Sequence, residues 1–373
     1  MLALQNALRG DEQRLDGLSS KTGIPVGRLH ELANGADPTM REVRSLAGVL
    51  KLAIPDLAPL SKETERAEIL FREMAHRKHI PAAALVETLS QRMAYSLELL
   101  HQAKSVPWWA KEFRSLPQGN PEAFAMHFRS FFCNGDSVSP LLSLPGLLLE
   151  RLQLMLHVVN TPHFEGASAY VDGIPFIFVS ARFPPRMLFT CAHELGHLLA
   201  HHDPEADFAT IDSSTDLQEH HSHSVSERFA HAFASALLIP PAGLGIVLKK
   251  IRQLANIPEQ SPLGDVEMLY VSRVFGVSFE VAARRCEDLD LLPRGGAVSL
   301  NNTLKEMYGS AEKRAEMLHL PPRPVISFPP LPLTLVNSAV ERIRKGEVSI
   351  GRASMMLGLS IKDLLTANST QLQ

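Results

Sequence analysis

The sequence predicts a mainly α-helical protein with one small β-sheet, an α+β fold. Apolar residues recur at helical spacing over most of the 373 residues, which favours helices. Residues 166–179 differ, because apolar residues there flank Asp172-Gly173, a pair typical of the turn of a β-hairpin. Six prolines between Pro321 and Pro332 mark a linker before a last helical region.

The composition is that of a folded protein without a signal for export. Hydrophobic residues make up 45% and charged residues 21% of the chain, which is ordinary for a globular protein. The net charge of −3 gives no general attraction to nucleic acid or membranes. Three widely spaced cysteines argue against a disulfide framework. Neither a signal peptide nor a transmembrane stretch is visible, so we expect a cytoplasmic protein without a membrane partner.

Short helices joined by tight turns make up the N-terminal part. Gly23 is placed to end one helix, and Pro25 to begin the next at 26–32. Thr39 is a candidate cap for a third helix at 40–50. Helices joined in this way describe a helix-turn-helix module.

Residues 18–57 resemble the phage-repressor-type (XRE) helix-turn-helix family. The resemblance implies a five-helix-type bundle with 26–32 as the recognition helix for DNA. In that helix only Arg28 and His30 can donate to bases or phosphates. Residues 1–57 hold seven Lys or Arg and seven Asp or Glu, although phosphate neutralisation carries much of the affinity for DNA. The module is therefore expected to bind DNA weakly, to bind it as a homodimer, or to serve as a protein-interaction domain. The matching residues are Thr22-Gly23-Ile24, Leu29, Asn34-Gly35, Pro38 and Leu46-Ala47.

The most specific motif is His193-Glu194-Leu195-Gly196-His197, an H-E-x-x-H sequence in a predicted helix at 185–200. Two histidines four residues apart lie on one face of a helix, where both can bind one zinc ion. Glu194 is placed to accept a proton from a water molecule that attacks the substrate. The motif predicts a metal-dependent hydrolase with one Zn²⁺ per chain. The alternative is two core or surface histidines on an amphipathic helix.

A catalytic zinc site needs a third protein ligand. We favour Glu227, because it lies on a predicted helix at 226–238 and a rigid element holds ligand geometry better than a loop. His231 follows four residues later on the same face. It is a candidate hydrogen-bond partner of the ligands or a donor to the oxyanion, and the alternative is a histidine buried in the core. The candidates for the third zinc ligand are Asp203, Glu219, His220, His221, His223 and Glu227.

Residues 186–197 and 227–240 resemble the ImmA/IrrE metallopeptidase family, whose second motif reads E-x-x-A-N-x-F-A-x-x-L-L-x-P. The resemblance implies a zincin-like minimal metallopeptidase core with a gluzincin-like site. In that site His193, His197 and Glu227 would bind zinc, and Glu194 would be the general base. One departure is His231, where the family usually has asparagine. This leaves the role of that position open, but not the ligand set.

The predicted organisation has five parts. Residues 1–60 are the helix-turn-helix, 61–120 a helical connector, 121–300 the metallopeptidase domain, 301–332 a linker that is Pro-rich at its end, and 333–373 a helical C-terminal region. Within the metallopeptidase domain we expect helices at 121–132 and 147–156 and an irregular segment at 201–224.

The resemblance implies a zinc metalloendopeptidase coupled to a DNA-binding domain. Such a protein would regulate transcription, in a stress response or in mobile-element control, by cleaving a partner repressor. Two alternatives stay open. In the first alternative the chain is a DNA-binding regulator whose peptidase-like domain senses a ligand and cuts nothing. In the second it is an antitoxin-like partner of a toxin.

Overall fold

The computed structural model describes residues 8, 12–34, 36, 38–50, 62–77, 83–100, 106–116, 119–161, 164–213, 224–328, 331–362 and 364. The chain divides into two compact units, Met1–Arg66 and Ala67–Gln373. Each unit is described by itself.

The described part of the first unit contains α2 (Glu12–Thr22), α3 (Val26–Ala33) and α4 (Met40–Leu50). Gly23 has φ +74°, which suits glycine at the end of α2. A capping box begins α4: the Glu42 amide donates to Thr39 Oγ1 (3.3 Å) and the Thr39 amide to Glu42 Oε2 (2.6 Å). The three helices bury one small core, which includes Leu15, Leu18, Ile24, Leu29, Leu32, Val43 and Leu46.

The second unit is built on a four-stranded mixed sheet in the order β1-β3-β2-β4. The strands are β1 (Met155–Val159), β2 (Phe164–Val171), β3 (Ile174–Ser180) and β4 (Phe208–Ser213). β1 runs parallel to β3, whereas β2 is antiparallel to β3 and β4. The predicted hairpin is confirmed, with Asp172 and Gly173 both at positive φ (+53° and +77°) between the paired residues Val171 and Ile174.

Two of these strands correct the sequence-based expectation. The helix expected at 147–156 is α10 (Leu144–Glu150), and β1 follows it after a short turn. The segment expected to be irregular at 201–224 contains β4. Both are short strands, and a short run cannot be assigned from periodicity alone.

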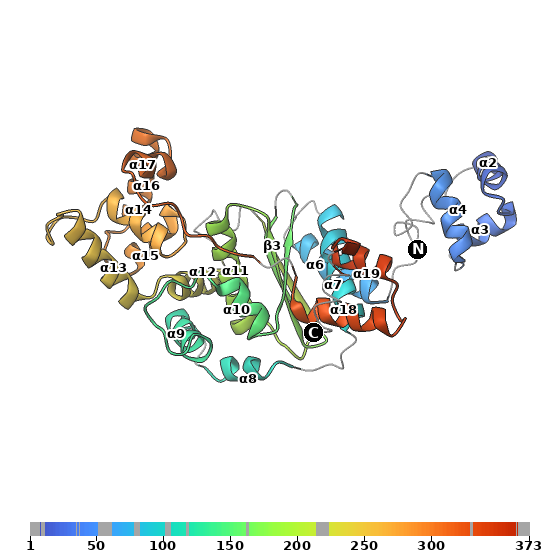
Figure 1. Ribbon diagram of the computed structural model, residues 1–373, viewed down its shortest axis with the longest axis horizontal. Helices are drawn as coiled ribbons and strands as arrows, with labels where there is room; N and C mark the ends of the chain where they lie inside the picture. Colours follow the sequence, from blue (N-terminus) through green and yellow to red (C-terminus); the bar gives the residue numbers. More distant parts are fainter. Residues whose placement is uncertain are drawn as a thin grey trace. The chain divides into compact units, whose positions relative to one another are not determined.

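Helices cover both faces of the sheet (Figure 1). On one face α11 (Pro184–Ala200) packs on β2 and β3, together with α10. On the other face lie α6 (Lys62–Arg77), α7 (Ala83–Leu100), α18 (Leu333–Arg344) and α19 (Ile350–Leu357). The inner strands β2 and β3 are therefore buried on both sides, and the sheet separates two apolar cores.

The face with α11 carries the larger core. It is extended by α8 (Trp108–Arg114), α9 (Pro121–Phe132), α12 (Val225–Leu238), α13 (Pro241–Leu254), α14 (Asp265–Val274) and α15 (Phe279–Asp288). The two neighbouring tryptophans of α8 differ: Trp109 is buried and donates through Nε1 to the Leu152 carbonyl (3.1 Å), whereas Trp108 is 60% exposed.

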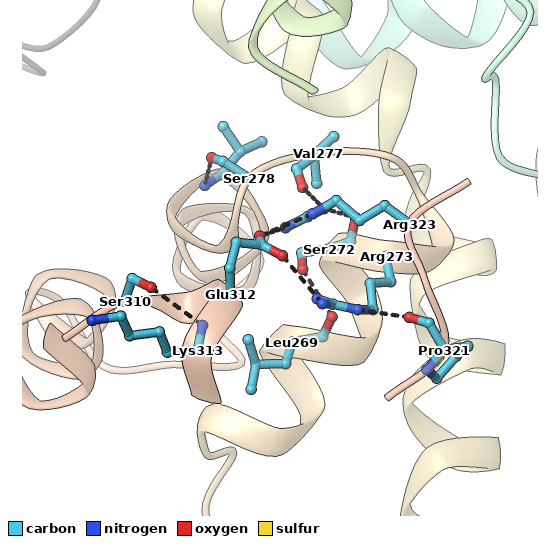
Figure 2. Close-up of polar contacts among 11 residues, drawn as sticks. Leu269, Ser272, Arg273, Val277, Ser278, Ser310, Glu312, Lys313, Pro321 and Arg323 are labelled. Atoms are coloured by element: carbon cyan, nitrogen blue, oxygen red, sulfur yellow. Dashed lines mark hydrogen bonds and ion pairs between the residues drawn. The ribbon is translucent and has the colours of Figure 1, made fainter. Parts of the chain in front are cut away.

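The expected linker at 301–332 is helical in its first half. Its residues continue α16 (Gly296–Tyr308) and form α17 (Ala311–Met317), and only 318–328 cross to the next part without helix. Figure 2 shows how this crossing is held: Glu312 accepts from Arg273 (3.2 Å) and Arg323 (2.8 Å), and Arg323 also donates to the Val277 carbonyl (2.9 Å). The proline-rich composition suggested a linker here, but Arg323 donates to the Ser272 carbonyl of α14 (3.2 Å), and the Pro321 carbonyl accepts from Arg273 Nε of α14 (3.0 Å).

Among the described residues, no single helix has the length and apolar character of a membrane span. Only α12 and α13 taken together pass that test, across a bend of 53°.

Candidate metal centre

The helix α11 presents the H-E-x-x-H motif from the interior of the larger core. Pro184 and Pro185 occupy its first turn, where the missing amide hydrogens cost nothing. Arg186 in the same turn forms a two-pronged ion pair with the buried Glu165 of β2, both at 2.8 Å. This pair ties the start of α11 to the sheet.

Glycine at 196 allows α12 to approach α11 closely. A Cβ atom there would lie 2.9 Å from Phe233 Cδ1 and 3.2 Å from the Ala230 Cα. The two helices carry ligand candidates on facing sides, so this close approach brings Glu227 of α12 to the histidines of α11.

His193, His197 and Glu227 converge on one point. The two Nε2 atoms lie 3.1 Å apart, and Glu227 Oε2 is 3.3 Å from His193 Nε2 and 3.5 Å from His197 Nε2. Ligands about 2.0–2.1 Å from a tetrahedral zinc lie roughly 3.3 Å from one another. Two imidazoles and one carboxylate at these separations therefore fit a zinc ion with a further position open.

The surroundings favour the ionised form of Glu227. Burial raises the pKa of Glu227, but hydrogen bonds and charges from His193 and His197 outweigh burial and hold this pKa far below its ordinary value. Burial lowers the pKa of the neighbouring His201 to about 4, so this ring is neutral at pH 7. The ionised carboxylate is the form of Glu227 that can bind a metal.

Glu194 points to the sheet rather than along the helix surface. The Ser168 hydroxyl on β2 donates to Glu194 Oε2 at 2.7 Å. A Cβ at Gly166 would lie 2.3 Å from Glu194 Oε1, so only glycine at this strand position leaves room for the carboxylate. Both Ser168 and Glu194 are fully buried.

His231 stands between the three converging side chains and a cleft. Its ring lies 4.9 Å from the His193 ring and 5.4 Å from Phe189. The cleft has a volume of about 960 Å³ and is lined by residues of α11, α12 and α15, among them Thr190 and His231, whereas the three converging side chains do not line it. A cleft of this size beside the site can admit a segment of peptide.

Two arginines fix the far end of α12. Arg129 of α9 donates from Nε and Nη2 to the Leu237 carbonyl (2.8 and 2.7 Å), and Arg285 of α15 donates from Nε to the Ile239 carbonyl (3.0 Å). Positive charge at a helix C-terminus complements the helix dipole. The helix that carries Glu227 is thus anchored at the end away from the site.

Residues 150–287 match the Peptidase_M78 family, the IrrE N-terminal-like domain. The matched segment begins at the end of α10 and ends within α15, so it contains the whole sheet, the motif helix and the helix of Glu227. The peptidase resemblance of this segment is thereby supported. Among curated proteins, none matches this sequence.

The other ligand candidates fall elsewhere or outside the described residues. Asp203 pairs with Arg114 at 2.7 Å, and its side chain is half exposed. Glu219, His220, His221 and His223 lie outside the residues that the structure describes. Within the described part of the chain, His193, His197 and Glu227 form the group placed to hold a metal.

The two DNA-binding candidates differ in their surroundings. Arg28 Nε lies 2.8 Å from Glu42 Oε1, and its Nη1 lies 2.8 Å from Glu31 Oε2. His30 is exposed on the same helix. The guanidinium of Arg28 is thus committed to two carboxylates of its own unit.

Sequence reasoning missed the residues that surround Glu194 from the sheet. Gly166, Ser168 and Thr210 come from β2 and β4, and His202 follows α11 directly. The hairpin signal at Asp172-Gly173 placed residues 166 and 168 in the expected hairpin. Nothing in the sequence, however, placed that hairpin against Glu194.

Proposed function

We propose that residues 150–287 form a zinc-dependent endopeptidase domain. In this proposal His193, His197 and Glu227 hold the metal, and Glu194 is the general base. The observation that carries the proposal is the set of separations among the three ligand atoms, 3.1, 3.3 and 3.5 Å, which are those of a tetrahedral zinc site.

The side chains of this chain divide the chemistry among them. Bound zinc would supply the Lewis acidity that polarises a peptide carbonyl. Glu194 accepts a proton from the attacking water and transfers it to the leaving amine, which is the role of a general base that then acts as an acid. His231, which lines the cleft, is placed to donate to the substrate carbonyl oxygen as negative charge develops on it.

The metal content of the purified protein tests the proposal. Wild type should carry about one zinc per chain, and His193→Ala should lose it, because one imidazole and the Glu227 carboxylate cannot replace the full set. Glu194→Gln should keep the zinc and lose peptide cleavage. Equal zinc content in wild type and His193→Ala would rule out the proposed zinc site.

The biological setting that we propose is cytoplasmic regulation of transcription, with a partner repressor as the protein substrate. The helical N-terminal unit supports this setting, because its α2–Gly23–α3 arrangement is that expected of a helix-turn-helix. Binding to DNA would fall steeply with salt if α3 contacts phosphates. Repressor levels should drop in cells with wild-type protein and persist with Glu194→Gln.

A second candidate is a regulator that senses a ligand and cuts nothing. The full burial of His193 and Glu194 favours it, because a substrate must reach both groups. Repressor loss that continues unchanged with Glu194→Gln would favour this candidate over the peptidase. Co-purification of a small toxin would instead favour an antitoxin role.

A further inference from the structure

The Ser168 hydroxyl is the centre of a buried polar cluster behind Glu194. It lies 2.7 Å from Glu194 Oε2, 3.1 Å from His202 Nε2 and 3.0 Å from Thr210 Oγ1. Ser168 and Glu194 are fully buried, and His202 is 4% exposed. These side chains come from β2, α11, the turn after α11 and β4, so the cluster joins the motif helix to the sheet.

The hydrogen-bonding capacity of each group fixes the direction of these bonds. A serine hydroxyl has one proton and two lone pairs. Ser168 donates its single proton to Glu194 Oε2. Its two lone pairs then face His202 Nε2 and Thr210 Oγ1, which themselves lie 3.3 Å apart. A proton on His202 Nε2 satisfies this arrangement, because Ser168 Oγ and Thr210 Oγ1 can both accept it.

We propose that Ser168 is a positioning residue for Glu194, and that His202 and Thr210 hold Ser168 in turn. Ser168 fixes one carboxylate oxygen, while the missing side chain of Gly166 leaves room for the other, since a Cβ there would lie 2.3 Å from Oε1. A carboxylate fixed in this way is oriented before the substrate arrives. The catalytic part of this inference rests on the proposed peptidase function.

The first test separates turnover from substrate and metal binding. Peptides cleaved by wild type would be selected from a quenched fluorogenic library of random sequence, and the most rapidly cleaved peptide used alone. Ser168→Ala should lower kcat about tenfold to a hundredfold, because it removes a hydrogen bond to a charged group, while KM and zinc content stay unchanged. Ser180→Ala is the matched control, since Ser180 is a buried serine of the neighbouring strand whose hydroxyl donates to the Thr161 carbonyl (3.4 Å). It should cleave like wild type.

The second test needs no activity. In full-length protein with ¹⁵N-labelled histidine, His202→Gln identifies the ring signals of His202 by their loss. The ring should carry its proton on Nε2 and exchange it slowly with solvent in wild type and Ser180→Ala. In Ser168→Ala this proton should exchange faster, because the nearer of its two acceptors is gone.

The outcomes separate the two proposals. If wild type cleaves no peptide, or if Glu194→Gln cleaves as well as wild type, the proposed peptidase function fails and the ring measurement alone decides the bonding. A His202 ring protonated on Nδ1, or a kcat for Ser168→Ala equal to that of Ser180→Ala, would overturn the positioning role.

Discussion

Replacing Gly196 with alanine tests how closely the two ligand-bearing helices approach. The added Cβ would lie 2.9 Å from Phe233 Cδ1 and 3.2 Å from the Ala230 Cα, whereas carbon atoms attract best about 3.5–4.0 Å apart. Phe233 is fully buried, and the Cα of Ala230 belongs to the backbone, so neither moves aside easily. The alanine must therefore push α12 away from α11.

The magnitude follows from two opposing effects. Overpacking a core costs about 1–3 kcal/mol in the free energy of unfolding, whereas alanine in a helix is favoured over glycine by about 1 kcal/mol. Gly245→Ala in α13 is the matched control, because nothing lies within 4 Å of its added Cβ. Gly245→Ala should stabilise by about 1 kcal/mol. The difference between the two variants, about 1–3 kcal/mol, then measures the steric clash without the helix preference.

Urea denaturation in the presence of a metal chelator would measure both variants without a contribution from bound zinc. Trp108 and Trp109 are the only tryptophans of the chain and lie in the unit Ala67–Gln373, so their fluorescence reports on that unit. Zinc affinity should fall in Gly196→Ala and stay unchanged in Gly245→Ala. Equal stabilisation by both alanines would refute the close approach as described.

Three further predictions concern stability. Burial lowers the pKa of His157 to about 3, against about 6.5 in the unfolded chain. Unfolded protein therefore takes up the proton first, and the stability present above pH 6.5 should fall by about 2 kcal/mol by pH 5. The urea midpoints at pH 7 and pH 5 should differ less in His157→Gln than in wild type. Arg129→Leu should destabilise the protein by at least about 2 kcal/mol, because buried carbonyls lose their donor. Arg284→Leu removes only a partly exposed ion pair and should cost below about 1 kcal/mol. Thermal melts of the two variants would measure the difference. Hydrogen bonds from Arg28 and Thr39 lower the pKa of Glu42 to about 2, so the first unit should lose stability as the pH falls from about 4.5 to 2. Hydrogen exchange of the α4 amides would measure this loss, which should be smaller in Glu42→Gln.

Long elements with a strong periodic pattern or a clear boundary residue could be predicted from the sequence. The α2–α3 break at Gly23, the hairpin turn at Asp172-Gly173 and the helix of the H-E-x-x-H motif are examples, because each boundary depends on local backbone chemistry. Short strands could not be predicted. β1 and β4 are edge strands of five and six residues, and their pairing with distant strands decides their conformation.

The candidate site could be predicted only in part for the same reason. Spacing along a helix placed His193 and His197 together. Its place on a predicted helix favoured Glu227, and the family resemblance implied the same ligand, which the structure brings within 3.5 Å of both. Ser168 meets Glu194 because α11 packs on β2, and Thr210 meets Ser168 because β4 pairs with β2. No pattern in either strand indicates these contacts. The roles of Glu227 as a zinc ligand and of Glu194 as the general base stay predictions.

The covering of the outer sheet face has a consequence for the order of synthesis. The Ser338 hydroxyl of α18 donates to the Leu99 carbonyl of α7 across 239 residues of sequence. At about 5–20 residues per second, the ribosome makes α18 roughly ten to fifty seconds after α7. The strands of the peptidase segment thus emerge with one apolar face still waiting for its last helices. The sheet that carries Ser168 therefore has both of its faces covered only after α18 and α19 have been made.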